Sequence, residues 1–508
     1  MNSKKSLTNI LSNILRQVIT LGLGIIIPRL VLVNLGSESS GLLNSINQIL
    51  AYVTLLEAGV GTASLQALYG PIANKDYPSV NSIMAATNHF YKRTGTFYFL
   101  VVLFLSILFP LTLDTDLSYR SVALVVFFSG MPGVINYYFQ GKFKILLQAE
   151  GKEYIVTNMM TIIQLATNIS KIILLLNGFD VVALQFMYLV FSLIQMIYIA
   201  LYMRRHYKWL NLGAVPSFEA LSQSRHVMIH QISGLIFNHT DMLLLTYFRG
   251  LKTVSVYSMY QLFMGIVDTM ICNFTGMTFA LGQAFHQDRN HYMKLHDAFE
   301  LYYTTLTFCL FCITNLFILP FMKLYTQGVQ DINYIDEMLP YLFIGTFLIS
   351  RSRTSCMHAI NFAGHFRQTQ WHAVVEALLN LSVSVFGVSR WGIHGVLLGT
   401  IVSLLFRSNS MILYASKHIL KRSPWFTYRR WLLNLVLFTL VTMTGKWMLS
   451  FVSLDSYFSI IGWAIVACAV VIPLFFGVVS LAEREVFATA MEILSPFLRK
   501  LRIGKHSV

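Results

Sequence analysis

The stretch "QAEGKEYIVTNMMTIIQLATNISKIILLLNGFDVVAL", residues 148–184, occurs in a second, diverged copy later in the same chain. The copy is "NFAGHFRQTQWHAVVEALLNLSVSVFGVSRWGIHGVLL", residues 361–398. Glycine and asparagine recur in register between the copies: Gly151 with Gly364, Asn168 with Asn380, and Gly178 with Gly392. A nearly constant offset of about 213 residues between matching positions indicates an internal repeat.

An earlier stretch repeats at a similar offset. "NLGSESSGLLNSINQ" aligns with "YFRGLKTVSVYSMYQ", which places Gly36 against Gly250. The repeat is therefore about six membrane spans long, and because six is even, both copies have the same orientation in the membrane. Two such copies are expected to form two lobes that are related by an axis along the membrane normal and share a cavity.

The composition is that of a polytopic membrane protein. Of the 508 residues, 56% are hydrophobic and only 12% are charged, whereas soluble domains carry about 25% charged residues. About twenty apolar residues cross a bilayer, which predicts about fourteen spans. They lie near residues 10–34, 41–68, 95–113, 121–140, 155–176, 181–203, 227–248, 253–278, 299–322, 338–360, 368–389, 392–415, 430–451 and 457–481.

The basic residues predict the orientation. Most of the 37 Lys and Arg residues lie on one side if the N-terminus is cytoplasmic, including "RRHYK" (204–208) and "KRSPWFTYRR" (421–430). The positive-inside rule then predicts cytoplasmic N- and C-termini. This topology and contact with anionic lipid account for the net charge of +15, which therefore implies no nucleic-acid partner.

These features predict an all-α fold of two six-helix lobes and two appended helices. The expected parts are an N-terminal lobe at 1–205, a cytoplasmic linker at 206–225, a C-terminal lobe at 226–420, two further helices at 421–481 and a cytoplasmic amphipathic tail at 482–508. A membrane glycosyltransferase or O-antigen ligase would need a large outer loop with catalytic groups. The outer loops here are short, so we expect no enzyme and no catalytic residues.

Several motifs carry a family resemblance. "PRLVLVNLGSESSGLLNSINQILAYVTLLEAGVGTASLQALYGPIA" (28–73) resembles the signature of the polysaccharide-repeat flippases of O-antigen and capsule assembly. These flippases belong to the multidrug/oligosaccharidyl-lipid/polysaccharide exporter superfamily. The resemblance continues in order through "FNHTDMLLLTYF" (237–248), "SVYSMYQLF" (255–263) and "AGHFRQTQWHAVVEALLNLSVSVFG" (363–387) to "WGIHGVLLGTIVSLLFRS" (391–408). It covers nearly the whole chain.

The resemblance implies a V-shaped transporter like those of the multidrug and toxin extrusion (MATE) branch, working by alternating access in the bacterial plasma membrane. Its implied substrate is a polyprenyl-diphosphate-linked oligosaccharide, moved from the inner to the outer leaflet. Membrane lipids, a polysaccharide polymerase and glycosyltransferases are the implied partners. No cofactor or metal is expected apart from a coupling H⁺ or Na⁺.

Two alternatives belong to the same superfamily. One is a multidrug exporter, whose cavity for cationic drugs should be acidic and aromatic. The first predicted span instead holds two arginines, Arg16 and Arg29, and no acid. The other alternative is a peptidoglycan-precursor flippase, whose substrate is also an anionic lipid.

Charged residues within predicted spans are functional candidates, because a charge at the bilayer centre costs roughly 2.5–3.5 kcal/mol on insertion scales. We predict that three arginines bind the substrate: Arg16, Arg29 and Arg351. Three other basic residues lie close enough to span ends to reach water along their aliphatic stems: Lys171, Arg407 and Lys446.

Arg351 and Arg353 interrupt the span at 338–360 and lie about 200° apart around an ideal helix. Glu376 on the next span has a depth close to that of Arg353, which predicts a structural ion pair between these two residues. Arg351 is then left for the cavity or for another pair within its lobe.

Three acids are candidates for coupling to H⁺ or Na⁺: Asp241, Asp268 and Glu57. A buried carboxylate can be neutralised by either cation. Hydrogen bonding to Asn238, Thr240 or a neighbouring helix is the structural alternative for the two aspartates. Glu57 has a depth similar to that of Arg16, which also permits an ion pair between them, either structural or broken during transport.

Overall fold

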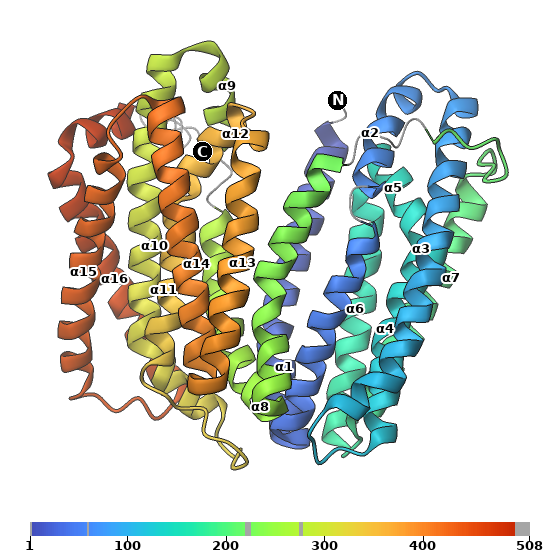
Figure 1. Cartoon of the computed structure of the whole chain (residues 1–508), viewed down its shortest axis with the longest axis horizontal. Helices are drawn as coiled ribbons and strands as arrows, with labels where there is room; N and C mark the ends of the chain where they lie inside the picture. The colour runs from blue at the N-terminus through green and yellow to red at the C-terminus, as the bar shows by residue number, and fades with distance from the viewer. Residues whose placement is uncertain (1–2, 58–59, 219–224, 274–277, 493–508) are drawn as a thin grey trace, which may run out of the picture. The chain divides into compact units, whose positions relative to one another are not determined.

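The structure is a computed structural model of the 508-residue chain. It describes residues 3–57, 60–218, 225–273 and 278–492. Within these ranges every regular element is a helix and no strand occurs, so the predicted all-α polytopic architecture is confirmed. Figure 1 shows the helices as long, approximately parallel rods within each part of the chain.

The chain divides into two compact units, which we call unit 1 and unit 2. Unit 1 comprises residues 1–258 and 328–332, and unit 2 comprises residues 259–327 and 333–508. The predicted lobes, 1–205 and 226–420, are defined by the sequence repeat and not by packing, and their boundaries stay a prediction.

The elements of the first part of the chain are α1 (Ser3–Val53), a short 3₁₀ turn (Thr54–Glu57), α2 (Val60–Ala73), α3 (Tyr77–Thr112), α4 (Tyr119–Ile135), a π-helical turn (Asn136–Gln140), α5 (Gly141–Ala149), α6 (Glu153–Leu176), α7 (Val181–His206) and α8 (Arg225–Asn273). Those of the second part are α9 (Thr278–Gln287), α10 (Arg289–Tyr325), α11 (Leu339–Ser352), α12 (Thr354–Phe362), α13 (Phe366–Trp391), α14 (Ile393–Tyr414), a π-helical turn (Ala415–Leu420), α15 (Trp425–Leu449) and α16 (Tyr457–Ala482).

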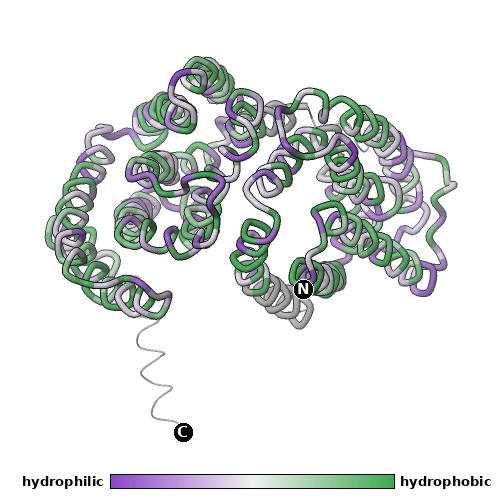
Figure 2. The backbone as a smooth tube through the Cα atoms, turned by 90° about the horizontal axis from the view of Figure 1, so that it is seen from below, coloured by the Kyte–Doolittle hydropathy of each residue, from purple (hydrophilic) through white to green (hydrophobic). Residues whose placement is uncertain are grey.

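Eleven helices among the described residues are long and apolar enough to cross a membrane. Two of them, Ile19–Val53 and Gly234–Asn273, each contain a glycine at which the helical backbone is interrupted. The span predicted at 338–360 is divided between α11 and α12, which are shorter. The result is consistent with about fourteen spans. Figure 2 shows hydrophobic residues along most of the helices and hydrophilic segments in several loops.

The internal repeat is visible in the backbone as well as in the sequence. Each glycine that the alignment pairs has a positive φ in both copies: Gly36 (80°) and Gly250 (79°), Gly151 and Gly364 (both 69°), and Gly178 (74°) and Gly392 (57°). L-residues rarely adopt this conformation, which costs glycine little. Gly36 and Gly250 even share the same ψ within 2°, at 174° and 172°. The repeated glycines therefore mark turns and helix interruptions that the two copies have in common.

The two copies also share an aspartate that caps the N-terminus of a helix, a feature that the sequence alignment did not include. Asp76 caps α3 by accepting a hydrogen bond from the backbone N of Ser79 at 3.2 Å. Asp288 caps α10 in the same way, from the backbone N of His291 at 3.3 Å, and also accepts from the backbone N of Asn290 at 2.8 Å. Both are ordinary N-caps, which satisfy donors that the first helical turn leaves unpaired. The starts of α3 and α10 are therefore further equivalent positions in the two copies.

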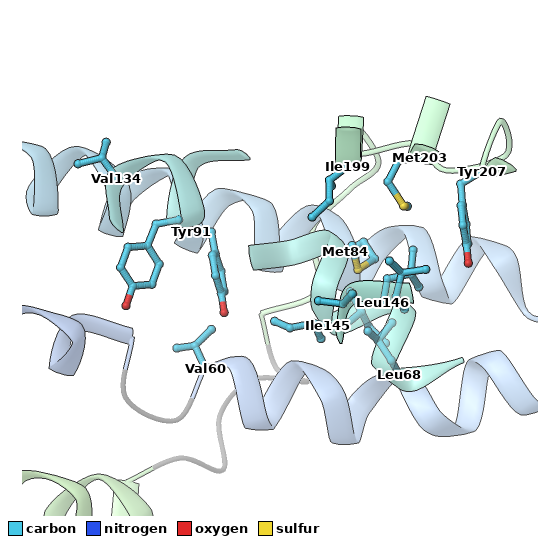
Figure 3. Close-up of a cluster of buried hydrophobic side chains, with 14 of the residues drawn as sticks. Val60, Leu68, Met84, Tyr91, Val134, Ile145, Leu146, Ile199, Met203 and Tyr207 are labelled. Atoms are coloured by element: carbon cyan, nitrogen blue, oxygen red, sulfur yellow. The ribbon is translucent and has the colours of Figure 1, made fainter. Parts of the chain in front are cut away.

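Unit 1 is held together by a buried apolar cluster (Figure 3). The members labelled in Figure 3 come from five helices and the loop after α7: Val60, Leu68, Met84, Tyr91, Val134, Ile145, Leu146, Ile199, Met203 and Tyr207. Other members lie on α1 and α6, among them Val53 and Met159. Large hydrophobic residues are also exposed along many helices, as for Phe104, Ile107 and Ile162, which are 60–64% exposed. Such a surface suits a lipid environment, where apolar side chains need no cover.

The segment after α7, residues 207–218, packs against the rest of unit 1. Asn81 on α3 accepts a hydrogen bond from the backbone N of Asn211 at 3.0 Å and donates to the carbonyl of Trp209 at 3.3 Å. The Trp209 ring packs on Tyr77, with centroids 4.5 Å apart. The first part of the predicted linker, through residue 218, is thus fixed along the beginning of α3.

Candidate functional site

Arg351 forms an ion pair with Asp268 inside unit 2. Its Nη2 donates to Asp268 Oδ2 at 2.5 Å, and its Nε donates to Oδ1 of the same carboxylate. Both donors therefore lie on one edge of the guanidinium, in the bidentate geometry that suits carboxylate and phosphate. The side chains are 28% and 13% exposed, respectively. Two residues that the sequence assigned to separate roles, substrate binding and ion coupling, are direct partners.

The local fold explains why these two groups meet. Asp268 lies on the second half of α8, after the interruption at Gly250, and Arg351 lies in the last turn of α11. The helical span breaks immediately afterwards, at Arg353, where ψ is −4° before α12 begins. Cys272 on α8 and Tyr303 on α10 interact electrostatically with both members of the pair. The pair thus lies where α8, α10 and α11 meet.

Arg353 and Glu376 are also brought together, with Arg353 Nη1 at 2.9 Å from Glu376 Oε1. A third residue joins them: the Nε of Arg407 lies 3.7 Å from Glu376 Oε2. Arg407 was expected to reach water, but it is only 7% exposed, and its Nη1 donates to the carbonyl of Thr369 at 3.0 Å. The expectation was wrong for Arg407 because the side chain turns into the contact between α13 and α14. We call Arg353, Glu376 and Arg407 the buried triad.

The buried triad leads to a testable prediction. Glu376→Gln should destabilise the protein by about 1–3 kcal/mol, since two guanidinium groups lose their charged acceptor. Adding Arg353→Met should recover only part of this loss, because Arg407 keeps its charge beside the glutamine. Thermal unfolding of the purified variants in detergent measures both effects. Complete recovery in the double variant would show that Arg407 does not depend on Glu376.

In unit 1, Asp241 is 5% exposed and accepts a hydrogen bond from the hydroxyl of Tyr257 at 3.1 Å. Both residues lie on α8, on either side of Gly250. The neighbouring Thr240 shares a hydrogen bond with Tyr52 on α1 at 2.6 Å. The structure therefore places Asp241 beside a hydrogen-bonded seam between the repeat-related helices, with Tyr257 of its own helix as a partner in place of the expected Asn238 or Thr240. A coupling role for Asp241 stays a prediction.

The same seam continues along α1 and α8. The hydroxyls of Ser45 and Thr246 are 2.7 Å apart, and Asn44 donates to Ser258 at 3.0 Å. At Gly41 the two backbones approach so closely that an added Cβ would lie 1.9 Å from the carbonyl oxygen of Leu251. Small residues permit this approach, and hydroxyl pairs satisfy the polar groups that it buries.

Glu57 lies at the end of the 3₁₀ turn after α1, where it accepts a hydrogen bond from the hydroxyl of Tyr91. Arg16 belongs to α1, but its side chain lies outside the described residues, so the predicted pair of Glu57 and Arg16 is untested. Arg29 is partly buried on α1, next to Pro28 and ahead of the interruption at Gly36. Glu57 and Arg29 belong to unit 1, whereas the Arg351–Asp268 pair belongs to unit 2.

The structure contains an ionic network of five residues that the sequence did not predict. Arg430 on α15 is 2% exposed and contacts three acids: Asp297 at 3.0 Å, Glu483 at 2.7 Å, and Glu300. Arg422 contacts Asp297 and lies 2.7 Å from Glu300. Burial alone would lower the pKa of Arg422, but Glu300 and Asp297 outweigh it and raise that pKa above its usual value. We call Asp297, Glu300, Arg422, Arg430 and Glu483 the end network.

The end network also explains a set of potential metal ligands. His296, Asp297 and Glu300 offer ligand atoms within 4.8 Å of one another. Both carboxylates are already engaged by Arg422 and Arg430, and Glu300 also accepts from Ser355 at 3.0 Å. Two guanidinium groups beside these oxygens would repel a metal ion. The arrangement therefore suits a structural ionic cluster that fastens α15 and α16 to α10.

Comparison with known proteins identifies the fold. No protein-family model matches the chain, and no curated protein matches it in sequence. Among solved structures, the lipid II flippase MurJ in an inward closed conformation matches with a TM-score of 0.70 and 13% identity, over 94% of this chain and 100% of that one.

Solved structures of multidrug transporters are also similar to this chain. A multidrug resistance MATE family transporter of the MOP superfamily, in an inward-facing conformation, matches with a TM-score of 0.61 and 14% identity, over 80% of this chain and 97% of its own. An outward-facing conformation of such a transporter gives 0.52 and 15% identity, over 79% and 93%. The chain is therefore a multi-pass membrane protein with the MATE-like fold of the MOP-superfamily transporters.

Proposed function

We propose that this chain is a flippase that moves polyprenyl-diphosphate-linked oligosaccharides across the bacterial plasma membrane for surface polysaccharide synthesis, with both termini cytoplasmic. The MOP-superfamily fold supports transport by alternating access. The resemblance of the sequence motifs to polysaccharide-repeat flippases supports the substrate class. A polysaccharide polymerase and glycosyltransferases are the proposed partners in the same process.

The observation that carries the proposal is the guanidinium fork of Arg351. It is held at a helix break, partly exposed, and already engaged by an anion in bidentate geometry. A diphosphate that crosses a low-dielectric region must replace its lost hydration, and fixed guanidinium groups can do so. Arg351 and Arg29, with Arg16 as the entry group, are the proposed diphosphate contacts.

The test is flipping of a fluorescent polyprenyl-diphosphate oligosaccharide in proteoliposomes. Arg351→Gln should lower the flipping rate by about tenfold or more, the equivalent of at least 1.4 kcal/mol at the rate-limiting step. Arg351→Lys should retain part of the rate, since lysine keeps the charge but loses the planar fork.

Arg351→Gln leaves Asp268 without its partner, so folding must be separated from transport. The double variant Arg351→Gln/Asp268→Asn removes both charges and serves as the folded comparison at matched protein amounts. Wild-type flipping rates in Arg351→Gln would exclude the cationic mechanism. Transport of lipophilic cations in place of the lipid would assign the chain to the multidrug function.

A second candidate is flipping of a peptidoglycan precursor. It is favoured by the similarity to the lipid II flippase structure, which covers nearly the whole of both chains. Its substrate is also an anionic lipid, so the arginines fit both readings. Offering lipid-linked peptidoglycan precursor and lipid-linked polysaccharide repeat in the same assay separates them by the head group that is moved.

A further inference from the structure

We propose that Arg351 and Asp268 form a competitive switch, in which the substrate diphosphate displaces the Asp268 carboxylate from Arg351 and the released carboxylate takes up a small cation. This inference rests on the proposed function, because it assigns the coupling step to that same site. The exchange is balanced: Arg351 trades one anion for another, and Asp268 gains one H⁺ or Na⁺ from solution.

The geometry makes the two anions mutually exclusive. Asp268 occupies Nε and Nη2 of Arg351, one complete edge of the guanidinium. A phosphate that uses the same edge needs both donors, because bidentate binding supplies its strength and orientation. The acid must therefore leave that edge when a diphosphate binds there.

Side-chain exposure distinguishes the Arg351–Asp268 pair from the buried triad and shows which of these two sites can exchange its anion. In the Arg351–Asp268 pair the arginine side chain is 28% exposed. In the buried triad, the side chain of Arg353 is 14% exposed and that of Arg407 is 9% exposed. Arg407 is also anchored to the carbonyl of Thr369. The triad is thus fixed within the helix contacts, whereas Arg351 can reach a ligand.

The surroundings of Asp268 explain why it should bind a cation once the diphosphate has displaced it from Arg351. The titratable groups that interact with it are Arg351 on α11, Cys272 on its own helix α8, and Tyr303 on α10. The thiol and the phenol are neutral near pH 7, so neither can replace the charge of Arg351. A partly buried carboxylate that loses its counter-ion is costly, and binding H⁺ or Na⁺ removes the cost.

Thermodynamic linkage between diphosphate binding and cation binding gives a consequence that can be measured as a change in affinity. If diphosphate binding promotes cation binding at Asp268, the cation must promote diphosphate binding by the same factor. The wild-type protein should bind the diphosphate more tightly as the pH falls, if the cation is H⁺, or as Na⁺ rises, if it is Na⁺. The two titrations distinguish the two cations.

The experiment measures the affinity of purified full-length protein for a polyprenyl diphosphate across pH and Na⁺ concentration. Asp268→Asn, which frees Arg351 without a competing charge, should bind about tenfold more tightly, a gain of roughly 1.4 kcal/mol, and should lose the dependence on both cations. Asp455→Asn, the same substitution at an exposed acid, should behave as wild type.

Two results would overturn the switch. One is an unchanged or weaker affinity in a folded Asp268→Asn variant. The other is a wild-type affinity that stays constant with both pH and Na⁺, a measurement that needs no variant at all. Failure of the proposed function is distinct, because the wild-type protein would then neither bind nor flip the polyprenyl-diphosphate lipid under any condition.

Discussion

Replacing Arg430 by glutamine should destabilise the folded protein by about 3–5 kcal/mol, as expected when one partner of a buried ionic network is removed. The same substitution at the adjacent Arg429, which is exposed, should change stability by less than about 0.5 kcal/mol. Thermal or denaturant unfolding of the purified proteins in detergent measures both, and the amount of protein in the membrane gives an independent readout.

Arg430→Gln should be destabilising because it leaves buried carboxylates without their guanidinium partner. Arg430 contacts all three acids of the end network, and its Nη2 lies 2.7 Å from Glu483. Without it, Arg422 alone stays beside Asp297 and Glu300. Glu483 then loses its guanidinium partner, and the end of α16 loses its charged link to α10.

A paired substitution checks this account. Arg430→Gln/Glu483→Gln removes one charge of each sign and should recover part of the lost stability. If Arg429→Gln were as harmful as Arg430→Gln, general loss of positive charge at this end of the chain would be the cause. The contacts within the end network would then not be responsible.

The repeat and the class of fold could be predicted from the sequence because both depend on local features. Hydrophobic runs mark the spans, and glycines with special backbone angles recur at a constant spacing. Arg353 and Glu376 could be paired in advance, since depth can be estimated by counting along two neighbouring helices. The structure places their charged atoms 2.9 Å apart.

Contacts that depend on tertiary packing could not be read in this way. Asp268 and Arg351 are 83 positions apart in the chain. The sequence left Arg351 either for the cavity or for a pair within its lobe, but it did not identify Asp268 as the partner. Depth estimates treated the span at 338–360 as one straight helix, whereas it breaks at Arg353. The direction in which Arg351 points depends on how its lobe packs around that break.

The end network was missed for a different reason. The segment 421–430 was interpreted through the positive-inside rule, which concerns topology and not contacts. A sign was nonetheless present: Asp297 and Glu300 are acids at the predicted cytoplasmic end of a span, among predominantly basic neighbours. Acids in such a position deserve to be tested as partners of the nearby arginines.

A close approach of two glycines in unit 2 leads to the second prediction with a large effect. Gly395→Val should destabilise the protein by about 3 kcal/mol or more, beyond the usual cost of overpacking. Gly387 on α13 and Gly395 on α14 face each other so closely that a Cβ added at Gly395 would lie 2.1 Å from the carbonyl oxygen of Gly387. The obstacle is backbone and not a flexible side chain, so the helices themselves would have to separate.

Gly477→Val provides the matched control. Gly477 lies on α16, and a Cβ added there meets no atom within 4 Å. Valine has a helix propensity slightly better than that of glycine, so this change should be neutral or stabilising by a few tenths of a kcal/mol. Opposite signs at two helical glycines would show that the space at Gly395 decides the outcome. Equal losses at both would instead assign the effect to valine in a membrane helix.

The position of Gly395 also connects the contact to the buried triad. α13 carries Glu376 and α14 carries Arg407, so the distance between these two helices sets the distance between the two charges. If Gly395→Val separates the helices, Arg407 should lose both its contact with Glu376 and its van der Waals packing.

Glu376→Gln should then cost less stability in the Gly395→Val background than in the wild type, because part of the interaction is already broken. Additive losses in that double-mutant cycle would mean that the glycine contact and the triad are energetically independent, although they lie on the same pair of helices.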